Sequence, residues 1–234
     1  MTRSPRTCLN VDAPMRGKGP SQPDLFLLLS LLLVILAYPL LDKGVAPRSI
    51  LTALMFIPVI LATVRLSQIK GWLWQSVLLM SATVTAGIVA RITANRIASG
   101  LRWGLLAAFL AFTVVGLFSY LRHVRSVGRA QLYTAASIYL LLGMLWFAAY
   151  RLIALYFPGS FLRGGHASTD VETDLLYFSL VTLSTVGYGD VTPLYGEVRI
   201  LAALEAVTGV LDVAITVAIL VSSYRRESLS PEKV

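Results

Sequence analysis

The residues whose types and spacing suggest a functional site lie in one short polar segment of this chain. Residues 184–193 read STVGYGDVTP and lie between two apolar stretches. Gly187 and Gly189 can adopt backbone angles that other residues avoid, so the carbonyl groups of residues 185–188 can point in one direction. A column of aligned carbonyl oxygens can replace the water shell of a dehydrated cation. The segment is therefore a candidate cation-binding site.

The composition places this segment inside a membrane protein. The 234 residues are 56% hydrophobic and 14% charged, with a mean hydropathy of +0.74, which is far from the mixture found in a soluble domain. The net charge of +8 comes mostly from Lys and Arg at the edges of apolar stretches. This pattern favours a role in membrane topology over a nucleic-acid partner. With Cys8 as the single cysteine, an intrachain disulfide is excluded.

The elements that must position the polar segment are apolar helices. Six apolar runs are long enough to cross most or all of a bilayer: 25–41, 49–64, 72–90, 103–121, 132–157 and 198–222. The first run could instead be a signal peptide, although its apolar stretch exceeds the usual signal core. The run 171–184 is too short to span and predicts a re-entrant half-membrane helix. We therefore expect an all-α membrane protein with six transmembrane helices, and a re-entrant pore helix and filter loop between the fifth and the sixth.

Several residues around the polar segment carry a resemblance to a known family. Tyr177 and Phe178 precede the sequence TVGYG at 185–189, Asp190 follows it directly, and the run RILAALEAVTG at 199–209 ends in Gly209. This combination resembles the bacterial potassium channels of the two-transmembrane ion channel family, which have a single pore loop per chain. The resemblance covers roughly residues 131–224, about 40% of the chain.

The resemblance implies roles for individual residues. It implies K+ as the permeant ion, no cofactor, no enzymatic activity, an outer mouth at Asp190 and an inner-helix hinge at Gly209. One chain supplies one filter strand, so the expected assembly in the lipid bilayer is a homotetramer. The residues expected to form the selectivity filter and coordinate K+ are Thr185, Val186, Gly187, Tyr188 and Gly189.

The same reading divides the chain into four parts. Residues 1–23 are expected to form a flexible cytoplasmic tail, 24–130 a four-helix N-terminal transmembrane domain, 131–224 the pore domain and 225–234 a short cytoplasmic tail. The Lys and Arg distribution predicts a multi-pass protein of the plasma or inner membrane with both termini in the cytoplasm.

One loop disagrees with this topology. Arg91, Arg96 and Arg102 fall between the third and fourth runs, on the outer side. Either later charges decide the orientation, or these arginines extend helices at the outer surface. The fourth run carries no charge, whereas a voltage sensor of the usual kind needs arginines at every third position. Classical voltage gating is therefore not expected.

Two acidic residues of the last run admit alternatives. Asp212 either lines the cavity of the pore or is buried and hydrogen-bonded to a neighbouring helix. The stripe expected to face the axis is Val210, Val213 and Val217. Glu205 is expected to pack behind the filter with a Ser or Thr of the pore helix. Some outer-loop acids are expected to pair with Arg151, Arg163 or Arg199 rather than attract cations.

Two functions remain open at this point. The first is passive K+ conduction through a homotetrameric pore. The second is a nonconducting regulatory or scaffolding subunit whose pore domain serves assembly. The intact TVGYG sequence favours conduction, because an assembly module would tolerate a degenerate segment.

Overall fold

The computed structural model describes residues 22–40, 57–58, 61, 73–122, 128–167 and 171–228. These residues are mostly helical, as the sequence predicts for a membrane protein. The helices are α1 (Gln22–Leu40), α3 (Leu73–Thr93), α4 (Arg96–Arg122), α5 (Arg129–Tyr156), α6 (Val171–Leu183) and α7 (Gly196–Ser228). Four of them, α3, α4, α5 and α7, are long and apolar enough to cross a membrane.

The helices agree with five of the six apolar runs. Runs 72–90, 103–121, 132–157 and 198–222 correspond to α3, α4, α5 and α7, and run 25–41 corresponds to α1. The apolar part of α1, Asp24–Tyr38, is shorter than the other four. Run 49–64 lies outside the described residues apart from positions 57, 58 and 61. The prediction of a short helix at 171–184 agrees with α6.

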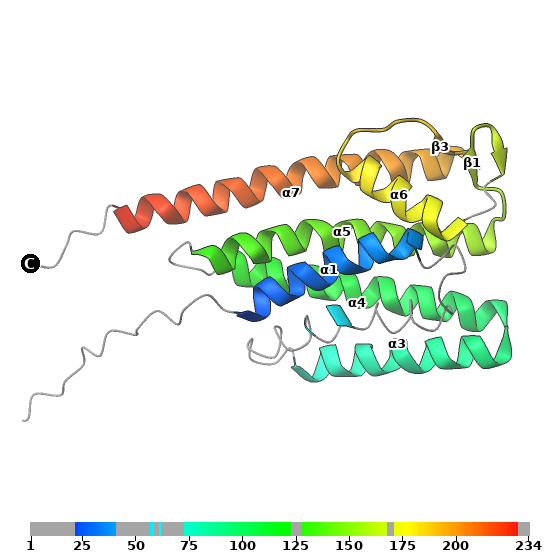
Figure 1. The fold of residues 1–234 in the computed structure, drawn as a ribbon, viewed down its shortest axis with the longest axis horizontal. Coiled ribbons are helices and arrows are strands. Elements are labelled where there is room, and N and C mark those ends of the chain that lie inside the picture. The colour runs from blue at the N-terminus through cyan, green and yellow to red at the C-terminus, as the bar shows by residue number, and fades with distance from the viewer. Residues whose placement is uncertain are drawn as a thin grey trace, which may run out of the picture.

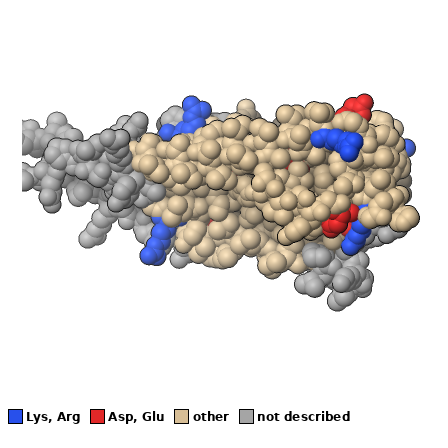
Figure 2. Space-filling view, turned by 90° about the horizontal axis from the view of Figure 1, so that it is seen from above, with Lys and Arg blue, Asp and Glu red and all other residues tan. Residues whose placement is uncertain are grey.

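The long helix α5 lies at the centre of the bundle. Helices α1, α4, α6 and α7 all pack against it, and α3 packs on the far side of α4. Figure 1 shows α6 and α7 on one side of α5 and the α3–α4 hairpin on the other. On the face drawn in Figure 2, uncharged residues occupy the middle of the molecule and the charged side chains of the described residues lie toward its two ends, as expected for a bundle surrounded by lipid.

Three short strands were not anticipated from the sequence. They are β1 (Phe161–Arg163), β2 (His166–Ala167) and β3 (Val191–Pro193), in the antiparallel order β2-β1-β3. Arg163 pairs with His166 on one side and with Val191 on the other. Because β3 forms the last three residues of the polar segment, this pairing fixes the end of the segment beside the connection between α5 and α6.

The three arginines that disagree with the predicted topology lie inside helices. Arg91 is in the last turn of α3, and Arg96 and Arg102 are in the first turns of α4. Arg96 donates hydrogen bonds of 2.6 Å and 2.8 Å from Nη2 to the carbonyl oxygens of Leu155 and Tyr156. It therefore caps the C-terminal end of α5, where carbonyl groups lack helical partners and a cation is favoured.

Candidate functional site

The backbone of the polar segment alternates in the sign of φ. Thr185, Gly187 and Gly189 have φ of 60°, 54° and 79°, whereas the residues between them are not in the positive-φ region. Alternation between the two hands of the backbone aligns successive N–H groups on one side and successive carbonyl groups on the other. The positive φ of Gly187 and Gly189 agrees with the backbone freedom expected of these glycines, and cation binding by residues 185–188 stays a prediction.

Three N–H groups of the segment donate hydrogen bonds to carbonyl oxygens at the end of α6. Thr185 N donates to Thr182 O at 2.9 Å, and Val186 N and Gly187 N donate to Val181 O at 3.0 Å and 3.3 Å. Within the described residues, the carbonyl oxygens of 185–188 accept no hydrogen bond. The C-terminus of α6, with its partial negative charge, adjoins these oxygens. The arrangement concentrates negative potential without using a carboxylate.

The sequence predicted Thr185 as a site residue but not its positive φ. Positive φ was expected for the two glycines, but a β-branched residue in this region is uncommon and strained by about 1–2 kcal/mol. Its N–H bond to Thr182 O, one turn back in α6, helps to hold it there. No feature of the residue type signals this conformation, because it depends on how α6 ends.

The segment is open to the surroundings in the single chain. Val186 is 53% exposed and Tyr188 is 72% exposed. A Cβ atom built on Gly187 or Gly189 would meet nothing within 4 Å. Such an exposed polar backbone within an apolar protein requires either water or further protein beside it.

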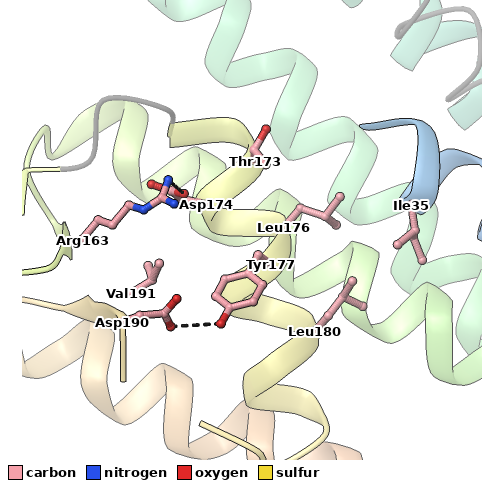
Figure 3. Close-up of a pocket in the computed structure, with 9 residues that line it drawn as sticks. All are labelled: Ile35, Arg163, Thr173, Asp174, Leu176, Tyr177, Leu180, Asp190 and Val191. Atoms are coloured by element: carbon pink, nitrogen blue, oxygen red, sulfur yellow. Dashed lines mark hydrogen bonds and ion pairs between the residues drawn. The ribbon is translucent and has the colours of Figure 1, made fainter. Parts of the chain in front are cut away.

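Aromatic and acidic side chains hold residues 188–190 of the segment. The rings of Tyr177 and Tyr188 are stacked, with centroids 6.4 Å apart and planes 5° apart. Tyr177 also donates its hydroxyl to Asp190 Oδ1 at 3.1 Å, as Figure 3 shows. Asp190 O accepts the backbone N–H of Gly164 at 3.0 Å. Tyr177 therefore links α6 to both ends of the tripeptide 188–190.

Two acids in the first turn of α6 pair with arginines, as the sequence predicts for part of the outer-loop acids. Asp174 accepts a bond from Arg163 at 2.8 Å, beside a cavity of about 420 Å³ that Figure 3 displays. Glu172 accepts a bond from Arg151 at 2.7 Å and another from the Tyr38 hydroxyl at 2.9 Å. Acids at this position also interact favourably with the N-terminal end of the helix. Helix α6 is thus anchored at its start by α1, α5 and β1.

Glu205 of α7 is completely buried and joins three helices. Its Oε2 accepts the Tyr150 hydroxyl of α5 at 2.6 Å, and its Oε1 lies 2.6 Å from Ser179 Oγ of α6. Ser179 Oγ is also 2.8 Å from Gly143 O of α5. The prediction that Glu205 packs behind the segment with a pore-helix Ser or Thr is confirmed. Tyr150 was not predicted, because nothing distinguishes it in sequence from the other tyrosines of α5.

Gly209 allows α7 to approach the end of α6. A Cβ atom at this position would lie 2.0 Å from Leu183 O and 3.0 Å from Leu183 C. The expected hinge at Gly209 stays a prediction, but the close contact gives this glycine a packing role of its own.

The remaining predicted residues lie on two different faces of α7. Val210, Val213 and Val217 are 56%, 51% and 52% exposed in the single chain. Asp212 is only 5% exposed and therefore lies away from this open face, as in the buried alternative. Its Oδ1 atom has no hydrogen-bond partner among the described residues. Lining of a cavity by the valines stays a prediction.

Comparisons with known proteins place this geometry in context. Residues 135–226 match a family model described as "Ion channel". This part of the chain resembles an ion-channel domain. The chain is 34% identical over 86 residues to potassium voltage-gated channel subfamily A member 5 of Mus musculus, covering 37% of this chain and 13% of that protein. It is 38% identical over 64 residues to subfamily A member 4 of Homo sapiens, covering 26% of this chain and 10% of that protein. No solved structure gave a significant match.

Proposed function

We propose that this chain is a potassium-selective channel subunit that conducts K+ passively through a homotetrameric pore. The observation that carries the proposal is the alternating backbone of residues 185–189 at the end of α6, in which the N–H groups of 185–187 are hydrogen-bonded to α6 and the carbonyls of 185–188 accept no hydrogen bond within the described residues. Four such strands around one axis would surround a dehydrated cation with oxygens. The similarity of residues 135–226 to ion-channel domains supports this proposal.

The exposure of the single chain supports the tetramer. The polar segment and the apolar face of α7 around Val210 and Val213 are open, and symmetric copies would cover the first and enclose the second. In this arrangement α6 is a re-entrant pore helix, Asp190 lies at the outer mouth, and the valine stripe lines the cavity. Both termini lie on the cytoplasmic side, and Arg96 caps α5 at the outer surface.

The relatives named above are voltage-gated channels, but we do not propose classical voltage gating for this chain. Between Arg102 and Arg122, α4 carries no basic residue. A membrane field therefore has no row of charges to move within this helix.

Ion flux into liposomes containing the purified chain tests the proposal. Rb+ or K+ uptake should exceed Na+ uptake and be blocked by Ba2+. If the reconstituted chain stays silent at all voltages and pH values, the nonconducting scaffolding function is the better description.

Gly187→Ala tests the segment itself. Because a Cβ atom at Gly187 has open space around it but φ is 54°, the substitution strains the backbone without a steric clash. We expect K+ selectivity or conduction to be lost. Gly196→Ala is the matched control, since Gly196 also has open space and its φ is not positive. An unchanged preference for K+ over Na+ in Gly187→Ala would contradict the filter assignment.

A further inference from the structure

One face of α7 carries a second polar site below Glu205. Asp212 and Thr216 follow Glu205 by seven and eleven residues, which is about two and three helical turns, so the three side chains lie on one stripe. Asp212 is 5% and Thr216 is 8% exposed. Asp212 Oδ1 and Thr216 Oγ1 are both buried without a hydrogen-bond partner in the described part of the chain.

Helix α5 presents a tyrosine to each acid. Tyr150 donates its hydroxyl to Glu205. Tyr139 lies eleven residues earlier in α5, on the same face of the helix, and interacts electrostatically with Asp212. Glu205 is therefore hydrogen-bonded to a tyrosine of α5, whereas Asp212 has a charge interaction with Tyr139 and its Oδ1 has no hydrogen-bond partner among the described residues.

No charge of the described chain compensates an ionised Asp212. No described Lys or Arg forms an ion pair with it, and Tyr139 of α5 is the described titratable group that interacts with it, while Glu205, the other buried acid of α7, lies about two turns away. An unpaired carboxylate in a low-dielectric interior is costly, whereas the neutral acid is tolerated. The buried position therefore suits a protonated side chain.

We propose that Asp212 is a proton-binding site of the inner helix: with its proton it packs against α5, and without it the half of α7 that follows Gly209 moves so that the carboxylate reaches water. Gly209 separates this half from the part of α7 that α6 and Glu205 hold in place. Figure 1 shows α6 beside the N-terminal half of α7. The inference rests on the proposed function, in which the water lies in the cavity at the axis.

The sign of the pH effect follows from this arrangement. At acidic pH the neutral acid keeps α7 packed on α5. As pH rises the proton leaves, and a carboxylate turned toward the axis attracts cations and holds the lower helix away from α5. Cation flux should therefore rise with pH.

Rb+ uptake into liposomes, measured from acidic to alkaline pH, tests the proposal with Asp212→Asn. We expect uptake by the unaltered chain to rise several-fold with pH, and uptake by Asp212→Asn to stay at the acidic level throughout. Glu197→Gln is the control, because Glu197 is an exposed acid of the same helix. The control should keep the rise. A full rise in Asp212→Asn would overturn the proposal.

Two further measurements keep the test decisive. At acidic pH, the infrared difference spectrum between the unaltered chain and Asp212→Asn should contain the band of one protonated carboxyl group, in which any contribution of Glu205 cancels, and this band should disappear as pH rises. If this band behaves as expected while no protein conducts at any pH, the proposed function fails and the proton site stands. If Asp212→Asn does not fold, Thr216→Val replaces it. Removal of the Thr216 hydroxyl, the polar neighbour of Asp212, should move the rise in flux to higher pH. A rise at the same pH as in the unaltered chain would overturn the proposal that the two residues form one site.

Discussion

The upper and lower halves of α7 carry one acidic residue each toward α5, and their surroundings differ. Glu205 has a hydroxyl from Tyr150 and another from Ser179, whereas Asp212 Oδ1 has no partner among the described residues. Both side chains are buried. A buried acid with partners on two helices holds those helices together, and a buried acid without them costs free energy in the packed state. A buried acid therefore stabilises the packing of the upper half of α7, at Glu205, and destabilises the packing of the lower half, at Asp212.

Glu205→Ala should have the largest effect on stability. It removes both hydrogen bonds and leaves Tyr150 and Ser179 facing a cavity, so we expect the free energy of unfolding in detergent to fall by about 3 kcal/mol. Asp212→Ala is the matched comparison and should be neutral or slightly stabilising, because it removes an unsatisfied group. Equal losses in the two variants would remove the distinction between the acids.

Glu205→Gln sharpens the same comparison. The Ser179 hydroxyl has one hydrogen but lies near two oxygens, Gly143 O and Glu205 Oε1. A neutral acid can donate to Ser179 while Ser179 donates to Gly143. Glutamine keeps one donor and one acceptor, so its cost should be less than half that of alanine. A cost as large as that of alanine would indicate an ionised Glu205.

Gly209→Ala should have the next largest effect on stability, because the added methyl group would push α7 away from the end of α6. The added methyl group would overlap Leu183 O, and the resulting displacement should cost about 2 kcal/mol in unfolding free energy. Gly104→Ala in α4, where a Cβ atom would meet nothing within 4 Å, is the control. It should be neutral or stabilising. If both variants behave alike in thermal unfolding, the close approach does not limit α7.

Tyr38→Phe should have the smallest effect. It removes one of the two donors to Glu172 and leaves the bond from Arg151, so we expect a loss of about 1 kcal/mol. A double-mutant cycle with Glu172→Gln measures the coupling between α1 and α6. Additive losses of unfolding free energy would show that the Tyr38–Glu172 bond contributes nothing to stability. The contrast between acids with and without hydrogen-bond partners would then be confined to Glu205 and Asp212 of α7.

The sequence predicted the features that depend on local chemistry. Glycines at 187 and 189 required positive φ, a run too short to span became α6, and a buried Glu205 required a hydroxyl partner such as Ser179. Each follows from the residue type and its neighbours in the chain. The backbone of the candidate site could therefore be anticipated in part.

Features that depend on long-range packing could not be predicted. The strands β1–β3 contain two or three residues each, too few for a pattern, and form only because distant segments meet. The position of α5 along and about its axis decides that Tyr150 rather than another tyrosine of the helix faces Glu205, and no periodicity in a mostly apolar helix fixes that position. The position of α1 against α5, which gives Tyr38 its place at Glu172, likewise left no trace in the sequence.

The junction at Glu172 bears on how this chain can be divided. Its donors come from α1 and α5, while Arg151 and Phe147 of α5 both contact Trp103 of α4. The boundary expected at 130 and 131 therefore crosses a continuous set of contacts that ends at the first turn of α6. A shortened chain beginning at Arg129 would lose the hydroxyl of Tyr38 and the indole of Trp103 together. Work on residues 129–228 alone would then describe an α6 with a loosened start rather than the one that the full chain holds.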